Sequence, residues 1–197
     1  MKRLFTLLPI ISIIFASAFA FAISNPELPK KKQTKLGLYM TSQQALHYIN
    51  RNAVSSLFVD VRSRAEINFL GAPTLIDANI PYMELSEWYT WNKKRSSFKL
   101  EVNSDFAAEV ARRLKEKGMG KSDTIILMCR SGSRSSKAAD LLASLGYTRV
   151  ISVIDGFEGD KAKEGPMKGQ RVVNGWKNNG LPWSYKLDQA KMYKIES

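Results

Sequence analysis

The sequence has few residues that could hold a metal or form a crosslink, because its 197 residues include one cysteine and one histidine. A single cysteine excludes an internal disulfide framework and a zinc site built from cysteines. One histidine leaves too few ligands for a histidine-rich metal site. The sequence therefore implies no metal and no organic cofactor.

Acidic residues are also scarce, with 18 Asp and Glu against 30 Lys and Arg, which gives a formal charge of +12. Such an excess is found in proteins that bind nucleic acid. The basic segment "PKKKQTK" (residues 29–35) has no aromatic residues that would stack on bases, so we favour a solvated basic surface and no nucleic-acid partner. A hydrophobic content of 44% at this length indicates one folded domain.

The first 22 residues have the pattern of a secretory signal peptide. Lys2 and Arg3 precede an apolar stretch over residues 4–15, and small residues follow it. An uncleaved membrane anchor is the rival, since about 18 residues just span a bilayer. The small residues favour cleavage, so we expect a periplasmic or secreted protein without stable membrane insertion. Residues 23–40 are expected to form a flexible basic leader that acts as a linker or touches a membrane surface.

From residue 41 the pattern alternates between helix and strand. Helices are expected over 41–52, 103–118 and 135–146, with a short one over 86–94, and strands over 56–61, 74–82, 123–129 and 148–154. In the second long helix Asn103 or Ser104 is the expected cap. The buried positions expected on the two later helices are Phe106, Val110, Leu114, Ala138, Leu141, Leu142 and Leu145. Strand, helix and strand in succession predict a parallel α/β sheet with right-handed crossovers.

The only cysteine, Cys129, lies at the end of the strongest strand, "DTIILMC", in the stretch "MCRSGSRSS". Ligands of such sheets bind beyond the carboxyl ends of the strands. The loop that follows collects free backbone N–H groups and the positive end of a helix dipole. Glycine lets the loop curl, the serines add donors and the arginines add charge; the residues are Arg130, Ser131, Gly132, Ser133, Arg134 and Ser135.

Each of these groups favours a thiolate over a thiol, and the same groups would hold an anion against the sulfur. The alternative is a buried, inert cysteine that packs as a small hydrophobe. That alternative explains a cysteine at the end of an apolar strand. It does not explain two arginines, three serines and a glycine directly after it, so we favour a reactive thiolate.

Several motifs in this order resemble a rhodanese domain. They are "CRSGSRS" with "KAADLLASLGYTRVISVIDG", "LFVDVRSRAE" upstream, "ANIPY", and the closing "GWKNNGLPW". The resemblance runs from about residue 41 to residue 183, and we expect the domain over 41–185, an insertion at about 159–173 and a tail over 186–197. It implies a five-stranded parallel sheet flanked by helices on both faces.

The resemblance also implies sulfur transfer. Cys129 would take a sulfane sulfur from a donor such as thiosulfate, polysulfide or a persulfide, hold it as a persulfide, and pass it to a thiol or protein acceptor. No histidine is needed as a base, because the loop amides stabilise the anionic sulfur directly. A carrier that binds a partner and does not turn over is the second hypothesis.

Loop length separates this family from its relatives that handle phosphate. Those phosphatases have five residues between cysteine and arginine, whereas four separate Cys129 from Arg134. The smaller cradle suits one sulfur atom, and we rank phosphatase or arsenate reductase activity below sulfur transfer. Members that use thiosulfate often have basic residues where this chain has Ser131 and Glu66, so thiosulfate is expected to be a poor donor.

Two further positions are expected to support the loop, at the carboxyl end of the 56–61 strand. We expect Asp60 to accept hydrogen bonds or to pair with Arg134. For Arg62 a supporting role and a solvated side chain remain equal alternatives. The 159–173 insertion follows the last strand, so it is expected on the same side as Cys129 and to line or partly cover the loop.

Overall fold

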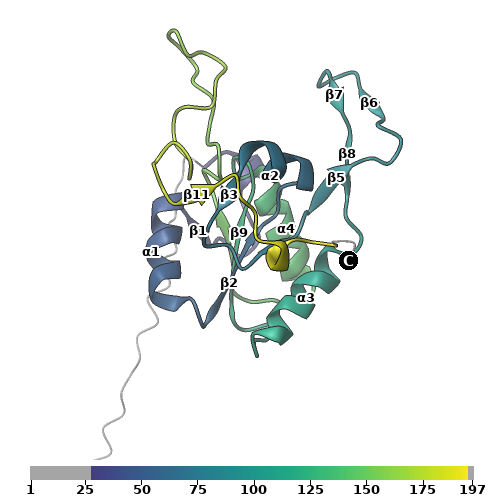
Figure 1. The fold of residues 1–197 in the computed structure, drawn as a ribbon, viewed down its shortest axis with the longest axis vertical. Helices are drawn as coiled ribbons and strands as arrows, with labels where there is room; N and C mark the ends of the chain where they lie inside the picture. The colour runs from purple at the N-terminus through teal and green to yellow at the C-terminus, as the bar shows by residue number, and fades with distance from the viewer. Residues whose placement is uncertain (1–27, 195–197) are drawn as a thin grey trace, which may run out of the picture.

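A computed structural model describes residues 28–194 of the chain. Its centre is a five-stranded sheet in which all neighbouring strands are parallel (Figure 1). The strand order is β1 (Tyr39–Met40), β10 (Val150–Val153), β9 (Thr124–Met128), β2 (Ser56–Asp60) and β4 (Ala78–Asn79). The order places β9, which ends next to Cys129, in the middle of the sheet.

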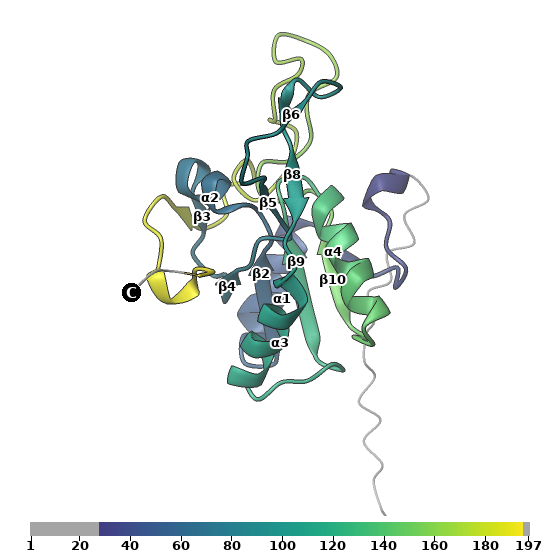
Figure 2. The same ribbon diagram turned by 90° about the vertical axis from the view of Figure 1, so that its right-hand side faces the viewer.

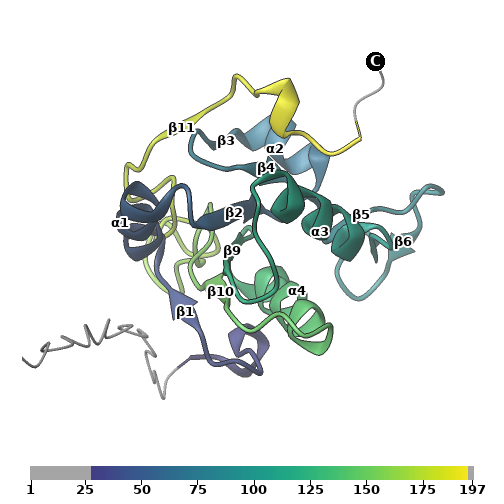
Figure 3. The ribbon, with the colours of Figure 1, turned by 90° about the horizontal axis from the view of Figure 1, so that it is seen from below.

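Four helices cover the two faces of the sheet (Figure 3). They are α1 (Ser42–Asn52), α2 (Arg64–Leu70), α3 (Phe106–Glu116) and α4 (Ser133–Ser144). Buried residues of α3 and α4 pack on one face, and those of α1 and α2 pack on the other. The fold is therefore the expected one, a five-stranded parallel sheet with helices on both faces.

Strand β9 shows why the sheet is buried on both sides. Its five residues are all buried; Ile125 and Leu127 enter one core and Ile126 and Met128 enter the other. A strand that is apolar on both faces is typical of a parallel sheet covered by helices. Local hydrogen bonds fix where a helix begins. In α1 they form a capping box between Thr41 and Gln44.

Two segments project from the end of the domain where the parallel strands finish (Figures 1 and 2). The first is a hairpin made of β5 (Met83–Leu85), β6 (Trp91–Asn92), β7 (Ser97–Phe98) and β8 (Leu100–Val102), paired antiparallel. The second is a loop that follows β10. Smaller elements are η1 (Lys30–Lys32), β3 (Ala72–Pro73), β11 (Trp183–Ser184) and η2 (Gln189–Lys191).

The leader is the clearest correction outside the site. Its described part, residues 28–40, packs on the domain, because η1 lies against α4 and residues 39–40 form the edge strand β1. Lys32 is 5% exposed and its Nζ lies 2.8 Å from Asp160 Oδ1. The signal-peptide assignment for residues 1–22 lies outside the described residues.

Other expectations for local structure also need correction. Residues 86–94 belong to the hairpin and not to a helix, because Trp91 pairs with Phe98 across the strands, with ring centroids 5.4 Å apart. Helix α2 was not expected. Leu145, the C-cap of α4, is 43% exposed and not inward, whereas Ala138 and Leu142 are buried and Leu141 packs partly buried against the core, as expected. The N-cap of α3 is Asp105, whose N–H donates to Asn103.

The expected tail also packs on the domain as far as it is described. Tyr193 is 6% exposed, and Leu187 and Met192 lie against the core. Within residues 28–194 no helix has the length and apolar character needed to cross a membrane.

Candidate functional site

Cys129 lies between β9 and α4 at the carboxyl edge of the sheet. We call residues 129–135 the cysteine loop. The Cys129 side chain is 1% exposed, so its sulfur lies at the floor of this loop and not on the surface. The neighbouring strand β2 ends at the same edge, because Asp60 lies opposite Met128 in the register.

The sulfur of Cys129 has polar contacts that a purely structural cysteine does not need. The N–H of Gly132 donates to Sγ at 3.1 Å, and the Ser135 Oγ lies 3.5 Å from Sγ. Ser152, on β10, donates from its own hydroxyl to Ser135 Oγ at 2.9 Å. Two groups therefore direct hydrogen-bonding atoms at the sulfur, and Ser152 bonds to the second of them.

The hydroxyl of Ser135 has a single proton and two acceptors within reach. It can be donated to the carbonyl oxygen of Gly132, at 3.1 Å, or to the sulfur of Cys129. Because Ser152 supplies a hydrogen bond to the oxygen of Ser135, the Ser135 proton stays free to follow a negative charge on sulfur. This arrangement can stabilise a thiolate or persulfide anion.

The backbone of the loop provides further donors. Helix α4 begins at Ser133, and the amides of Ser133, Arg134 and Ser135 in its first turn have no acceptor within residues 28–194. Free amides at a helix N-terminus attract negative charge. Gly132 starts the turn with φ of 92°, and a Cβ there would lie 2.3 Å from the Ile154 carbonyl oxygen. Glycine is therefore required at this position.

The segment after β10 holds the loop from behind. The N–H of Phe157 donates to the Cys129 carbonyl at 2.8 Å, and the amides of Glu158 and Gly159 donate to the Arg130 carbonyl. Gly156 approaches so closely that a Cβ would lie 2.4 Å from the Cys129 carbonyl oxygen. These bonds fix the carbonyls on the outer side of the turn, which leaves its amides facing inward.

Of the two alternatives for Asp60, the structure shows accepted hydrogen bonds, from the backbone N–H and the guanidinium of Arg62. The Asp60 carboxylate pairs with Arg62, Nη2 to Oδ2 at 2.6 Å, and both side chains are fully buried. The pairing with Arg134 is therefore wrong, because the nearer Arg62 occupies the carboxylate. The Arg62 guanidinium also lies 3.9 Å from the centre of the Phe157 ring, so its alternative reading as a solvated side chain is wrong.

Arg134 pairs instead with Glu66 on α2. Its Nη1 and Nη2 lie 2.5 and 2.6 Å from the two carboxylate oxygens, a bidentate geometry. Burial alone would raise the pKa of Glu66, but the hydrogen bonds and charge of Arg134, with Ser63 and Arg62, lower it to about 2. Burial likewise opposes the charge of Arg134, yet Glu66, Cys129 and Asp60 raise its pKa.

The remaining loop residues divide between backbone and surface. The side chain of Arg130 turns towards Glu158, with Nε 2.6 Å from Oε2. Ser131 and Ser133 are half-buried. Each arginine named for the site therefore has a carboxylate partner: Arg62 with Asp60, Arg130 with Glu158 and Arg134 with Glu66. These three arginines are neutralised by their partners, whereas Arg171, whose charge also acts on Cys129, has no carboxylate partner within residues 28–194.

The expected insertion begins beside the cysteine loop. Gly159 donates to the carbonyl of Arg130, and Arg171 returns to donate to the carbonyl of Gly159 at 2.5 Å. Burial and the charge of Arg130 hold the pKa of Arg171 below its usual value. The base of the insertion therefore adjoins the loop, as expected, while its middle projects from the domain (Figure 1).

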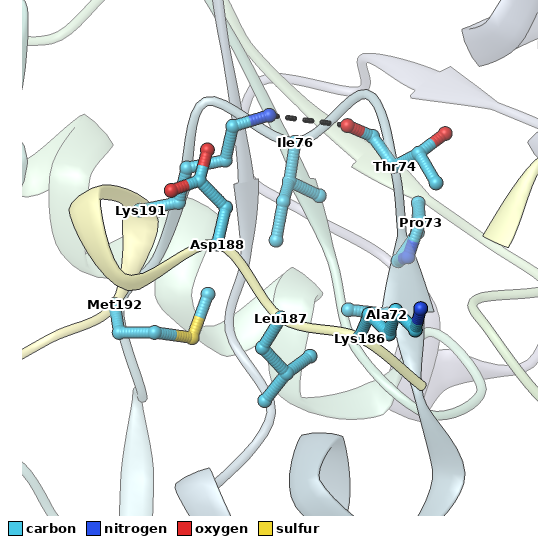
Figure 4. A pocket seen from close by; sticks show the side chains of 9 residues that line it. All are labelled: Ala72, Pro73, Thr74, Ile76, Lys186, Leu187, Asp188, Lys191 and Met192. Carbon is cyan, nitrogen blue, oxygen red and sulfur yellow. Dashed lines mark hydrogen bonds between the residues drawn. The ribbon is translucent and has the colours of Figure 1, made fainter. Parts of the chain in front are cut away.

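The cavities lie elsewhere. One of about 210 Å³ is lined by β3 and residues 186–192, where Lys191 Nζ donates to the carbonyl of Thr74 (Figure 4). A second, of about 400 Å³, adjoins α2 and Tyr193. Neither includes a residue of the cysteine loop. In the described part of the chain no three His, Cys, Asp or Glu side chains gather in a way that could hold a metal ion.

Sequence reasoning missed three parts of the site: Ser152, Gly156 and Glu158. Only Ser152 has a weak sequence signal, a hydroxyl within the otherwise apolar strand "VISV". In the structure this hydroxyl residue is fully buried. Gly156 and Glu158 reach the loop through the chain reversal after β10, which no local pattern describes.

Replacement of Gly132 tests the turn. We expect Gly132→Ala to lower the free energy of unfolding by about 3 kcal/mol, through strain at positive φ and the clash with Ile154. Gly118→Ala is the matched control, because Gly118 has φ of 68° with open space around it, and should cost about 1 kcal/mol. Urea unfolding measures both, and equal losses would contradict the close packing of the turn.

The Glu66–Arg134 pair predicts an acid-dependent loss of stability. The pKa of Glu66 in the folded protein is about 2, below its ordinary value of 4.5. The contribution of Glu66 to the free energy of unfolding is therefore complete above pH 4.5. It is lost as the pH falls towards 2, a change of about 3 kcal/mol. Chemical denaturation between pH 6 and 2 should show this loss, and Glu66→Gln should remove it. A variant with the wild-type slope would refute the pairing.

Known proteins resemble this chain in sequence and in fold. The Rhodanese-like domain family matches residues 41–163, more than half of the chain. An uncharacterized protein of Rickettsia prowazekii, RP600, is 32% identical over 138 residues, covering 70% of this chain and 87% of that protein. Thiosulfate sulfurtransferase 16 of Arabidopsis thaliana, a chloroplastic protein, is 30% identical over 125 residues, covering 64% and 77%.

Among solved structures, the crystal structure of Rv0390 from M. tuberculosis matches with a TM-score of 0.56 and 29% identity. It covers 75% of this chain and 97% of that one. The matched range of 123 residues contains all the strands of the five-stranded sheet except β1, and it contains the turn that carries Cys129. The chain belongs to the rhodanese-like family.

Proposed function

We propose that the protein is a sulfurtransferase in which Cys129 carries a sulfane sulfur as a persulfide. The observation that carries the proposal is the hydrogen bond from the Gly132 amide to Cys129 Sγ at 3.1 Å, inside a turn of free amides. Family membership and a relative named as a thiosulfate sulfurtransferase support it.

The chemistry consists of two displacements on sulfur. In the first, the Cys129 thiolate attacks the outer sulfur of the donor, a new S–S bond forms, and the donor leaves with the electron pair of its broken bond. In the second, a nucleophile attacks the outer sulfur of the persulfide, and the electron pair of the S–S bond returns to Cys129. No external oxidant or reductant is consumed.

The loop residues have separate roles in this proposal. Gly132 and Ser135 hold the inner sulfur, and the free amides of Ser133 and Arg134 receive the charge that moves to the outer sulfur. Asp60 and Arg62 brace the strand end beneath the loop. His47 takes no part, because it is exposed on α1 and no proton has to be removed from a bound thiolate.

The charges around Cys129 affect which sulfur donor the loop accepts. Thiosulfate carries two negative charges on a compact group, and Arg130 and Arg134 beside the sulfur are paired with carboxylates. Ser131 adds no positive charge, and Glu66 adds a negative one. A persulfide with one charge, or a polysulfide with its charge spread along a chain, therefore fits the loop better than thiosulfate does.

The deep position of Cys129 favours one alternative. A side chain that is 1% exposed reaches any acceptor only when the loop gives way, which binding of a partner can bring about. In the alternative, the protein is a carrier that loads sulfur once and releases it only to a protein partner. Export, inferred from residues 1–22, would place either activity in the periplasm or outside the cell.

The intact mass of protein beginning at residue 23, before and after exposure to polysulfide or thiosulfate, tests the proposal. We expect a gain of one sulfur atom on Cys129, larger with polysulfide, that is lost on addition of cyanide as thiocyanate forms. Cys129→Ser should gain none. Repeated thiocyanate formation indicates turnover, whereas a persulfide that forms but is not discharged by cyanide indicates a carrier. No gain from either donor would refute persulfide chemistry.

A further inference from the structure

The two segments that project from the domain leave it on either side of the cysteine loop. We call residues 83–102 the aromatic arm and residues 160–173 the basic loop. The arm follows β4 and the basic loop follows β10, while Cys129 follows β9, which lies between these strands in the sheet. Both project beyond the carboxyl edge of the sheet in two perpendicular views (Figures 1 and 2).

The aromatic arm exposes large apolar side chains that contribute to neither core. Trp88 is 85% exposed, Tyr89 62%, Trp91 52% and Phe98 49%. The rings of Tyr89 and Trp91 pack edge-on against Phe98, with centroids 5.8 and 5.4 Å away. Aromatic side chains gathered on an exposed surface are characteristic of binding sites, where Trp and Tyr provide most of the contact energy.

Both projecting segments also carry exposed positive charge. On the arm, Lys93, Lys94, Arg95 and Lys99 are exposed and have no carboxylate partner within residues 28–194. The outer part of the arm, residues 88–99, contains no acidic residue, while the exposed Glu87 and Glu101 lie nearer its base. On the basic loop, Lys161, Lys163 and Lys168 are exposed, and Glu164 is the only acidic residue after Asp160, which is held by Lys32.

Charge is therefore distributed differently near the sulfur and farther from it. Beside Cys129, Arg130 and Arg134 are paired with carboxylates, which weakens their attraction for a free dianion, while Arg171 has no carboxylate partner within residues 28–194. Lysines and arginines without a carboxylate partner lie on both projecting segments and also elsewhere on the basic surface of residues 28–194. This distribution suits a large acidic body that brings a sulfur group of low charge to the loop. A second copy of this basic chain would be repelled.

We propose that the aromatic arm and the basic loop together form a docking surface for an acidic protein segment that carries a cysteine, the partner with which Cys129 exchanges sulfur. The inference rests on the proposed function. The partner's thiolate attacks the outer sulfur of the Cys129 persulfide, the S–S electron pair returns to Cys129 Sγ, and the partner leaves as the persulfide. A membrane or a nucleic acid matches the charge but offers no thiol.

A binding experiment tests the surface without sulfur chemistry. The full chain with Cys129→Ser is titrated against a fluorescently labelled peptide of Asp and Glu with one Cys, and against its Asn and Gln counterpart. We expect about tenfold tighter binding of the acidic peptide at low salt, lost at 0.5 M salt. Equal binding of the two peptides would overturn the proposal.

Matched variants locate the binding. The triple change Lys93→Gln, Lys94→Gln and Arg95→Gln should abolish the preference for the acidic peptide. The control removes three exposed charges at the opposite edge of the sheet, through Arg51→Gln, Lys115→Gln and Arg149→Gln, and should keep it. Equal losses in both variants, or tighter arm-dependent binding of phosphatidylglycerol vesicles or oligothymidylate, would contradict the proposal.

The rate of sulfur transfer from Cys129 tests whether the docking surface assists the reaction. After loading with polysulfide, the arm variant should transfer sulfur to the acidic peptide about tenfold more slowly than wild type, and equally fast to cyanide. An equal slowing with cyanide would overturn the inference, since the change would then act on the loop. If Cys129 gains no sulfur from polysulfide, the proposed function is refuted. The binding titration uses no sulfur transfer, so it tests the docking surface independently.

Discussion

The turn that joins β9 to α4 is the constraint on which the site depends. It must end a fully buried strand, place a cysteine and begin a helix within four residues. Gly132 makes this possible because only glycine tolerates its backbone angle against the Ile154 carbonyl. The amides of the segment 157–159 occupy the outward carbonyls of the turn, so the remaining amides face the sulfur. The chemistry that we propose follows from this geometry.

Paired charges are the second feature that organises the site. Asp60 with Arg62 and Glu66 with Arg134 are buried or nearly so, and such pairs cost much to break because one charge is left without a partner. They join β2, α2 and α4 around the loop, and each pair neutralises its own charges close to the sulfur. The lysines and arginines of the two projecting segments have no carboxylate partner within residues 28–194, so a macromolecule that docks there can pair with them.

Sequence periodicity predicted the central strands and the helices α1, α3 and α4, because apolar residues recur there at regular spacing. It also identified Cys129 and its loop, since glycine, serines and arginines are contiguous. It failed where structure depends on distant contacts. The leader packs through Lys32 and Asp160, 128 residues apart, and the partner of Arg134 lies 68 residues away on α2. No local pattern in residues 86–94 indicated the antiparallel pairing of Trp91 with Phe98.

The balance of charge at the sulfur is tested most directly by the rates at which thiosulfate and polysulfide load Cys129, followed by stopped flow in wild type and in Glu66→Gln. The account predicts that wild type loads faster from polysulfide. It also predicts that the variant, with the charge of Arg134 released towards the loop, loads from thiosulfate about tenfold faster than wild type. An unchanged thiosulfate rate in the variant, or faster loading of wild type by thiosulfate than by polysulfide, would contradict it.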